Sequence, residues 1–426
     1  MNLPINPEVP EIMHIDLNSA FAMTEQQANP LLRGKPVGIT NRLNDYAICI
    51  AASYEAKRLG VGLGTRQREG RWRAPGLVML ESDAPKYQFV HRQIRTIFES
   101  YSPTAYMKSI DEGVIDFRGM RGLLKGRSME DIGYEIKQRI RDEVGDHMTV
   151  NVGIGQNRWL AKLAAGFLKP DGMYSIDRDN LAVVYGLLQL TDLPYIASHN
   201  KVRLFEAGIY APLDFFMADE ITLTRGVFHS ILGHHWYLKL RGYETETETG
   251  VRTVGRSYVL EHRTRDPEEI ATLLYKAAVK ISRRLRTNDL AARGLMVQFG
   301  YVGETMGEGW ERYRHRGTGW NGRRMYPTAV RRADQLYARA LDLYRESPQD
   351  QTLASLVITS YALEPVRHDQ PTLYESEDVR RDRIESAINL VNDKYGELVL
   401  APASVKASRN PMKDKIPFGT VRYFDT

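Results

Sequence analysis

Residues 101–117 read YSPTAYMKSIDEGVIDF, two apolar runs on either side of an acidic turn, which predicts a pair of strands. The turn carries Asp111 and Glu112. Far upstream, another apolar run, IMHI at residues 12–15, ends in Asp16. A carboxylate at the end of a buried strand lies near the interior and still meets solvent. Spacing along the chain leaves open whether the three acids meet, because each alone is equally typical of a turn or a helix cap.

Three carboxylates that converge would repel one another strongly unless a cation lay between them. Oxygen ligands favour Mg²⁺, which keeps several waters and shares the phosphates of a substrate. Two such ions about 3.5–4 Å apart can activate an attacking oxygen and stabilise a leaving one. If Asp16, Asp111 and Glu112 meet in space, the sequence therefore predicts a site for two Mg²⁺ ions.

Hydroxyl and ammonium groups elsewhere in the sequence are candidates for phosphate contacts. Tyr54 and Lys57 lie on the helix predicted after AAS at residues 51–53, and Lys169 precedes a Pro-Asp-Gly turn. Lysine offers phosphate a point charge and tyrosine a hydroxyl donor. The alternative is that each of these three side chains is simply exposed at the surface and binds no phosphate.

The composition is that of an ordinary globular protein. The 426 residues include 58 Lys and Arg against 53 Asp and Glu, a net charge of +5, and 42% are hydrophobic. The single cysteine, Cys49, excludes an internal disulfide framework and a cysteine-rich zinc module. No stretch approaches the roughly 20 apolar residues of a membrane span, and the start MNLPINPEVP is unlike a signal peptide. We therefore expect a cytoplasmic protein with no membrane partner.

Strand and helix patterns are interleaved up to about residue 176, which predicts an α/β or an α+β unit, and for the chain as a whole we expect an α+β fold. Residues 180–243 are mainly helical in pattern. The segment YETETETG at residues 243–250 is low in apolar content, so we expect an extended linker there.

The excess of positive charge lies in residues 251–350, which hold 19 Lys and Arg against 12 Asp and Glu, a net of +7. Such a concentration is typical of a nucleic-acid partner, or of a solvated helix face. The periodicity of this region predicts the order β-α-β-β-α-β. The six elements are expected at residues 253–260, 274–285, 295–302, 310–316, 329–343 and 353–361.

Three arginines alternate in WERYRHR at residues 310–316. Alternation along a strand places Arg312, Arg314 and Arg316 on one face of the sheet. A row of guanidinium groups can follow the phosphates of a DNA backbone. The alternative is an exposed sheet face without a partner.

Four stretches resemble the Y-family (translesion) DNA polymerases of the bacterial DinB/UmuC type. They are MHIDLNSAFAMTEQQANPLLRGKPVGI (13–39), AASYEAKRLGV (51–61), YSPTAYMKSIDEGVIDF (101–117) and NVGIGQNRWLAKLAAGFLKPDGMYSI (151–176). They occur in the family's order and cover most of residues 12–176, which makes the resemblance highly specific. The last third of the chain is similar mainly through its β-α-β-β-α-β order, which is that of the family's little finger domain.

The resemblance implies a polymerase built like a right hand. Its parts would be a palm at residues 1–19 and 84–176, fingers at 20–83, a helical thumb at 177–243, a linker at 244–252, a little finger at 253–362 and a C-terminal tail at 363–426. The implied activity is template-directed DNA synthesis across lesions, of low fidelity and without proofreading. It would use primer–template DNA, dNTPs and two Mg²⁺ ions, in DNA repair and the SOS response.

The resemblance also implies which residues hold the metal ions and select the sugar. The family's metal-binding acids fall on Asp16, Asp111 and Glu112, and the backbone carbonyl of Leu17 would also reach a metal. The family's steric gate falls on Phe21. An aromatic ring there would collide with a ribose 2′-OH and so select deoxynucleotides.

Further positions are implied for the nucleotide. The family's triphosphate contacts fall on Tyr54, Lys57 and Lys169. The roof over the incoming base would come from the neighbourhood of Ile48 and Ile50.

The chain departs from the family pattern in three places. Position 57 is lysine where arginine is usual, which loses bidentate phosphate geometry. Ala20 precedes the gate where a second aromatic is common. In the thumb, LPYIASHNKVRLFEAGI at residues 193–209 has Tyr195 and Ala197 where the family has the glycines of a phosphate-binding turn.

The tail holds one more motif. QPTLYES at residues 370–376 resembles the short peptides with which bacterial polymerases hold the sliding clamp. An extended peptide could place Gln370, Leu373 and Tyr374 in an apolar groove. The alternative is a structural turn. The segment that follows, Val379–Tyr395, has the pattern of an amphipathic helix.

Three functions remain open from the sequence. The first is a template-directed lesion-bypass DNA polymerase. The second is a non-catalytic relative that binds DNA and the clamp, which would be expected to have lost acids that this chain keeps. The third is a metal-dependent nucleotidyl cyclase on a similar palm, which would need neither the basic final domain nor a clamp peptide.

Overall fold

The structure is a computed structural model. It describes residues 5–45, 47–124, 126–245, 251–302, 319–366, 377–396, 398–410 and 412. The chain divides into two compact units, with the division after residue 247. Within the described ranges, no helix has the length and apolar character needed to cross a membrane.

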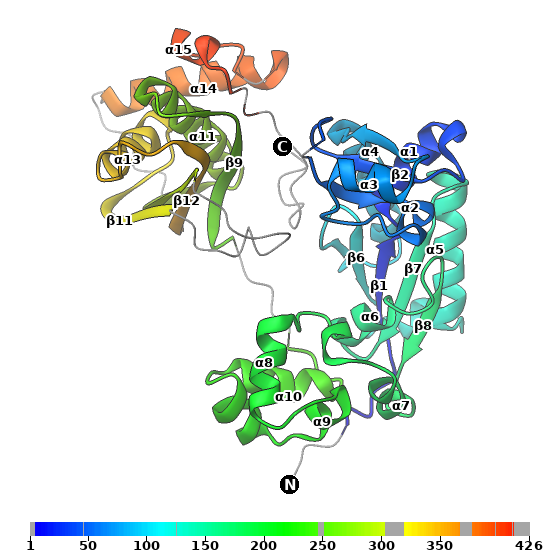
Figure 1. The fold of residues 1–426 in the computed structure, drawn as a ribbon. Coiled ribbons are helices and arrows are strands. Elements are labelled where there is room, and N and C mark those ends of the chain that lie inside the picture. The colour runs from blue at the N-terminus through cyan, green and yellow to red at the C-terminus, as the bar shows by residue number, and fades with distance from the viewer. Residues whose placement is uncertain are drawn as a thin grey trace. The chain divides into compact units, whose positions relative to one another are not determined.

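The first unit is built on a five-stranded sheet (Figure 1). Its strands are β1 (Ile12–Leu17), β5 (Tyr106–Met107), β6 (Glu112–Asp116), β7 (Val150–Gly155) and β8 (Met173–Ile176). They lie in the order β5-β6-β1-β7-β8, and all neighbours are antiparallel except the pair β7–β8. The predicted strand pair around the turn at residues 111–113 is therefore β5 and β6.

Helices cover both faces of this sheet, which is why the central strands are apolar along most of their length. Helices α4 (Ala84–Glu99) and α5 (Met129–Glu143) pack on one face, through isoleucines of both helices. Helix α6 (Arg158–Ala164) packs on the other. A Cβ on Gly153 would lie 2.1 Å from the carbonyl oxygen of Ala161, so glycine is required where β7 and α6 meet.

A smaller sheet lies between β1 and α4 in the sequence. Its strands are β2 (Val37–Thr40), β3 (Cys49–Ala52) and β4 (Val78–Glu81), in the order β3-β2-β4. The elements around it are α1 (Ala20–Ala28), η1 (Pro30–Leu32), α2 (Tyr54–Arg58) and α3 (Gln67–Arg73). Cys49 is buried in this sheet as a thiol, as its apolar neighbours predict.

The rest of the first unit after β8 is helical, as predicted for residues 180–243. Its elements are α7 (Leu181–Gly186), η3 (Leu190–Asp192), α8 (Ser198–Glu206), α9 (Pro212–Met217), η4 (Thr222–Val227) and α10 (Leu232–Leu240). Their core is aromatic, with Trp236 packed against Trp159 of α6. A further short helical turn, η2 (Arg121–Leu124), precedes α5.

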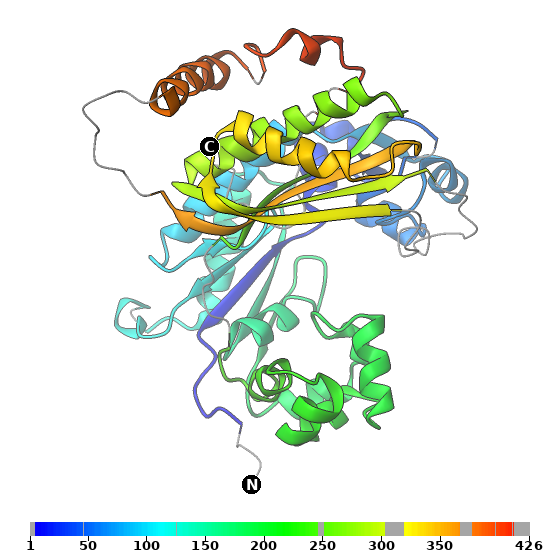
Figure 2. The same ribbon diagram turned by 90° about the vertical axis from the view of Figure 1, so that its left-hand side faces the viewer.

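The second unit has the predicted order β-α-β-β-α-β. Its elements are β9 (Thr253–Thr264), α11 (Pro267–Thr287), β10 (Leu290–Tyr301), β11 (Gly319–Val330), α13 (Ala333–Arg345) and β12 (Leu353–Pro365). The sheet is antiparallel in the order β11-β10-β12-β9. Figure 2 shows α11 and α13 side by side on one face of it, where the core of the unit lies. The prediction of an α+β fold is confirmed by both units.

In this unit one predicted strand is not tested by the structure, and one predicted helix boundary needs correction. The strand predicted at residues 310–316 lies outside the described residues, and β11 fills its place in the order. The helix predicted from Ala329 begins at Ala333, because Ala329 belongs to β11.

A C-terminal segment packs on the second unit and contains α14 (Glu377–Tyr395) and α15 (Ala403–Ala407). The carboxylate of Glu385 accepts hydrogen bonds from the Ser282 hydroxyl at 2.8 Å and from the Ala333 amide at 3.0 Å, so it caps α13. The Asn410 side chain bonds both backbone groups of His262. The helix predicted at Val379–Tyr395 is thus part of the unit's structure.

Candidate active site

The pairing of β1 with β6 brings the three predicted acids together at one end of the five-stranded sheet. Asp16 and Glu112 are register partners. The Leu17 amide donates a hydrogen bond of 2.8 Å to the carbonyl of Asp111. Residues directly opposite in an antiparallel pair have Cα atoms about 4.5–5.5 Å apart. Three acids that are far apart in the sequence therefore share one small region.

Each carboxylate has a hydrogen-bonding partner there. Glu112 accepts from the ammonium of Lys162 at 2.5 Å and contacts Nε2 of His14 at 3.1 Å. Asp16 is bound by the ammonium of Lys169. Asp111 accepts from the hydroxyl of Ser109 at 2.5 Å.

The two acids of the turn have opposite pKa shifts. Burial raises the pKa of Asp111, and the negative charges of Asp16 and Glu112 raise it further against the bond from Ser109. Burial also favours the neutral form of Glu112, but the bonds and charges of His14 and Lys162 lower its pKa to about 2. Negative charge is therefore concentrated at this end of the sheet, and basic partners hold it there.

The acids suit a divalent cation. Carboxylate and carbonyl oxygens are the ligands that Mg²⁺ prefers, and a cation would remove the repulsion that Asp111 experiences. Among the described residues, no three His, Cys, Asp or Glu side chains stand in a ligating arrangement. Asp16 and Glu112 are instead turned toward Lys169 and Lys162.

The side chains predicted to bind phosphate gather beside the acids. Helix α2 begins with a cap from Ser53 and carries Tyr54 and Lys57 on its first turns. The Tyr54 hydroxyl donates to Asn18 at 3.1 Å, and the Lys57 ammonium donates to Ser19 at 2.7 Å. Asn18 and Ser19 directly follow β1, so α2 faces the end of the strand that carries the first acid.

The electrostatics agree with this placement. Burial lowers the pKa of Lys57, and the positive charge of Lys169 lowers it further, while the charge of Asp16 opposes the shift. Burial and the charge of Asp16 together raise the pKa of Tyr54. Two cations and a phenol therefore surround one carboxylate, an arrangement that suits a polyanionic ligand.

Contacts with α5 and with β7 hold the loop that carries Lys169. Lys137 of α5 pairs with the Asp171 carboxylate at 3.2 Å, and Arg141 of the same helix also binds it. The Gly172 amide donates to the Asn151 side chain at 3.2 Å. These contacts hold the loop against the sheet, so Lys169 has a defined position.

Phe21 lies on α1 and is 5% exposed. Its ring stacks on Tyr87 with centroids 4.6 Å apart, and the Tyr87 hydroxyl donates to Glu25 at 2.9 Å. Ile50 of β3 belongs to the same apolar cluster as Phe21, whereas Ile48 is half-buried outside it. The proposed gate is therefore a ring held in place by its packing.

Sequence reasoning missed the residues that hold Glu112. His14 stands two residues before Asp16, so the alternation of a strand could have placed both on one face. Burial lowers the pKa of His14 against the effect of Glu112. Lys162 gave no comparable signal, because its contact depends on how α6 packs on the sheet.

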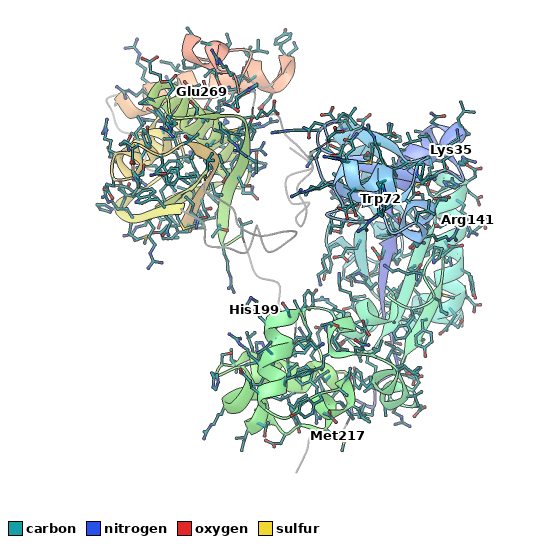
Figure 3. All side chains as sticks on the ribbon, in the orientation of Figure 1. Lys35, Trp72, Arg141, His199, Met217 and Glu269 are labelled. Carbon is teal, nitrogen blue, oxygen red and sulfur yellow. The ribbon has the colours of Figure 1, made fainter. Side chains whose placement is uncertain are left out.

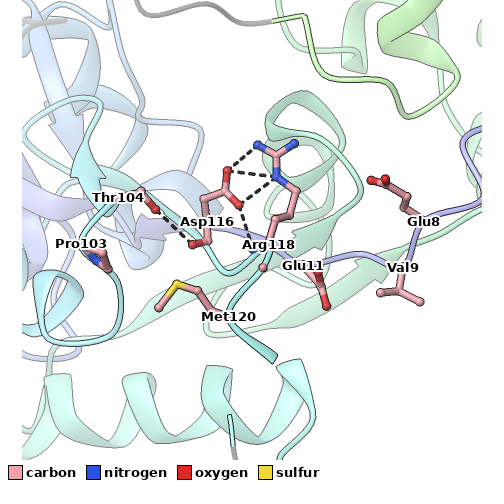
Figure 4. A pocket seen from close by; sticks show the side chains of 9 residues that line it. Glu8, Val9, Glu11, Pro103, Thr104, Asp116, Arg118 and Met120 are labelled. Carbon is pink, nitrogen blue, oxygen red and sulfur yellow. Dashed lines mark hydrogen bonds and ion pairs between the residues drawn. The ribbon is translucent and has the colours of Figure 1, made fainter. Parts of the chain in front are cut away.

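A cavity of the first unit lies away from the acids. It has a volume of about 670 Å³ and opens near the start of β1 and the end of β6 (Figure 4). Glu8, Glu11 and Asp116 line it, together with Arg118, which pairs with Asp116 at 2.5 Å. Its acidic walls do not suit a nucleotide.

Two further predictions fall on residues outside the described ranges. One is the arginine row, Arg312, Arg314 and Arg316; the other is the clamp peptide, with Gln370, Leu373 and Tyr374.

The chain matches two family models. Residues 15–166 match the impB/mucB/samB family, and residues 251–373 match the C-terminal domain of that family. DNA polymerase IV of Staphylococcus aureus strain Newman is 28% identical over 290 residues, which are 67% of this chain and 80% of that protein. The proteins of that name from strains COL and JH9 match over the same shares.

Solved structures have the same fold. A Y-family DNA polymerase chimera built from Dbh and Dpo4 superposes with a TM-score of 0.68 at 22% identity, over 83% of this chain and 99% of the chimera. The insertion ternary complex of Dbh DNA polymerase has a TM-score of 0.57, and DinB from Sulfolobus solfataricus 0.54, each over 82% of this chain and 98% of the other.

Proposed function

The chain belongs to the impB/mucB/samB family of Y-family DNA polymerases, and on that premise we propose that it extends a primer on a DNA template, lesions included. The reaction is the transfer of a nucleotidyl group from a dNTP to the primer 3′-OH. The observation that carries the proposal is the meeting of Asp16 with the Asp111–Glu112 turn. The phosphate-binding side chains beside them support it.

We propose Mg²⁺ as the divalent cation, held as two ions by the carboxylates of Asp16, Asp111 and Glu112 and by the carbonyl of Leu17. The pKa of Asp111 is raised first by burial and then by the charges of Asp16 and Glu112, and a cation would offset both effects, which supports this assignment. When bound, such ions lower the pKa of the primer hydroxyl and neutralise the triphosphate.

The chain's own side chains would position the substrates. Lys57 and Lys169 would neutralise the triphosphate, and Tyr54 would donate a hydrogen bond to it. Phe21, fixed against Tyr87, would exclude a ribose 2′-OH. Holding the reactants in line in this way supplies most of what the protein contributes to nucleotidyl transfer.

Residues around Glu112 would keep that carboxylate in place. The lysine of α6, Lys162, and the buried His14 both bond its Oε2. A carboxylate held from two sides loses less freedom when it binds a ligand. We therefore assign His14 and Lys162 as positioning residues.

We propose that the chain has the domains of its family, namely palm, fingers, thumb, linker, little finger and tail, at the boundaries that the resemblance implies. Within the little finger, β11 carries the exposed residue Arg323, whereas its neighbour Arg324 pairs with Glu346, so Arg323 supports a role for this sheet along a DNA backbone. We extend this role to Arg312, Arg314 and Arg316. We also propose that Gln370, Leu373 and Tyr374 bind the sliding clamp.

The test is primer extension by purified full-length protein with primer–template DNA, Mg²⁺ and the four dNTPs. We expect template-directed addition on an intact template and on a template with an abasic site. A protein that binds the DNA and adds no nucleotide would be the non-catalytic relative. A protein that makes a product without primer and template would be a cyclase.

A further inference from the structure

A tryptophan of the first unit is almost fully exposed to solvent. Trp72, labelled in Figure 3, lies near the end of α3 and is 83% exposed. Tryptophan is highly buried on average, because its ring carries a large apolar surface. A ring that contributes this little to the core of its own domain is well suited to contact a partner, since tryptophan is enriched at binding hot spots.

The chain around this ring is strongly basic. Residues 57–73 hold six Lys or Arg and one acid. Arg71 and Arg73 have carboxylate partners, at 3.3 and 2.5 Å. Arg66 and Arg68 are exposed, and neither pairs with a carboxylate of the described residues. Two cations are therefore available to a negatively charged partner.

Arg68 and Trp72 lie on one face of α3. Positions i and i+4 of an α-helix are neighbours on its surface, and the buried residues of this helix are Gln67 and Gly70 on the other side. A Cβ on Gly70 would lie 2.9 Å from the Leu77 side chain, so that side packs against the fold. An exposed aromatic ring beside a guanidinium group suits single-stranded nucleic acid, in which every base can stack and every phosphate carries a charge.

The start of α3 is joined to the roof that the resemblance implies over the incoming base. Arg66, the residue before α3, forms an antiparallel bridge with Ile48. Beside this bridge the Gln67 amide donates to the Ala47 carbonyl at 2.8 Å. Helix α3 therefore begins next to the place where the new base pair would form, and a template strand being copied must pass this place unpaired.

We propose that Trp72, Arg66 and Arg68 bind the unpaired template strand ahead of the templating base. One base would stack on the indole, and the two guanidinium groups would pair with phosphates. The position of α3 beside the roof favours DNA over an acidic peptide as the partner. The inference rests on the proposed function and assigns to α3 a contact beyond the nucleotide site.

The geometry of α3 indicates which nucleotide would reach the ring. Trp72 lies about 9 Å along the helix from Arg66, at a rise of about 1.5 Å per residue. Neighbouring nucleotides of a stacked strand are about 3.4 Å apart. We therefore expect the second or third nucleotide beyond the templating base on the ring.

The first test varies the length of the template overhang. Primer–templates with 5′ template overhangs of one, two, four or eight nucleotides are bound to the full-length protein, and affinity is measured by fluorescence anisotropy. In the wild type we expect affinity to rise about five- to tenfold between one and four nucleotides, with little gain beyond. In Trp72→Ala the ratio of these two affinities should fall to about one. A gain that persists in this variant would overturn the proposal.

The controls separate this contact from general effects of an exposed ring or charge. Phe89→Ala and Arg92→Gln remove an exposed ring and an exposed cation from α4 of the same unit, and both should keep the overhang gain. Arg68→Gln should lower it and reduce the slope of log affinity against log salt by about one, because one phosphate contact is lost. A wild-type slope in Arg68→Gln would contradict the phosphate contact.

The second test locates the stacked base. A single abasic nucleotide, which keeps its phosphate and lacks a base, is placed in turn at the first six positions beyond the templating base. We expect the wild type to lose affinity about five- to tenfold at the second or third position, with no further loss in Trp72→Ala. Equal losses at every position, or a loss that remains in the variant, would contradict the stacking.

Primer extension by the wild type is measured in parallel on the same DNA. If the wild type extends primers while the length of the overhang has no effect, the contact with α3 is wrong and the polymerase assignment stands. If the wild type extends no primer, the proposed function is wrong whatever the binding results.

Discussion

The two ends of strands β1 and β6 carry acids of the same kind in different surroundings. At one end Asp16 faces Glu112 across the ladder, and their partners Lys169 and Lys162 come from distant parts of the chain. At the other end Asp116 is bound by Arg118, two residues further on. The cavity of about 670 Å³ lies at this second end.

The difference shows how a functional site can be recognised. An acid whose partners come from distant parts of the chain is a better indication of such a site than a large cavity is. Burial raises the pKa of Asp116, but the bonds from Arg118 more than reverse this, so that carboxylate is satisfied locally. The pKa of Asp111 is instead raised by burial and by two neighbouring acids. At the first end a bound cation would relieve the repulsion among these acids.

The largest effect is expected from the acidic turn. Replacement of Asp111 and Glu112 by alanine should lower the rate of single-nucleotide incorporation by about 10³-fold or more, since the charge that binds metal is removed. Affinity for primer–template should remain measurable by fluorescence anisotropy. Asp116→Ala, on the same strand, is the control and should retain activity. Normal extension by the double variant would remove the metal assignment.

Phe21→Ala should have the next largest effect, on sugar selection. Loss of the ring leaves room for a 2′-OH, so incorporation of ribonucleotides relative to deoxynucleotides should rise about 10- to 100-fold. The readout is the ratio of kcat/KM for one rNTP and its dNTP. Tyr87→Phe keeps the stacked ring beneath Phe21 and should leave this ratio unchanged. An unaltered ratio in Phe21→Ala would show that the gate lies elsewhere.

Lys57→Ala and Lys169→Ala should each raise the KM for dNTP about tenfold, because each removes one charge-assisted contact to the triphosphate. Steady-state kinetics at saturating DNA would measure this. Lys35→Ala, which removes an exposed lysine of the same unit, is the control. If Lys57→Ala and Lys169→Ala had the same KM for dNTP as Lys35→Ala, we would conclude that Lys57 and Lys169 do not contact the triphosphate.

The smallest effect is expected at the second end of the sheet. Arg118→Ala breaks a partly exposed ion pair and should change the free energy of unfolding by about 0–1 kcal/mol. The folded-state pKa of Asp116 is lowered, so the contribution of the pair is fully present above the unfolded pKa of about 4 and is lost at lower pH, as the pH falls through the folded-state pKa. Denaturation at pH 7 and pH 3 would measure it. A large loss of primer extension in this variant would contradict our assignment of the active site to the other end of the sheet.

The sequence predicted the parts of the molecule that depend on local patterns. The apolar runs ending in Asp16 and in the Asp111–Glu112 turn are strands, and their polar ends coincide, because antiparallel pairing aligns them. The α+β fold and the order of the second unit followed from periodicity in the same way. Resemblance to a family supplied the roles of individual residues.

Contacts set by packing could not be predicted. Lys162 reaches Glu112 only because Gly153 lets α6 approach the sheet. Glu385 caps a helix that begins more than fifty residues before it. The departure at Tyr195 was visible in the sequence, but the approach of Lys108 and Lys239 to its ring was not.

The central claim is that the three acids bind divalent cations at the point where the primer end and the dNTP meet. Crystals of the protein with primer–template, an unreactive dNTP analogue and Mn²⁺ would test it through the anomalous signal of manganese. We predict peaks in contact with the carboxylates of Asp16, Asp111 and Glu112. Manganese bound elsewhere, with nucleotide and primer in place and no peak at the three carboxylates, would contradict the account.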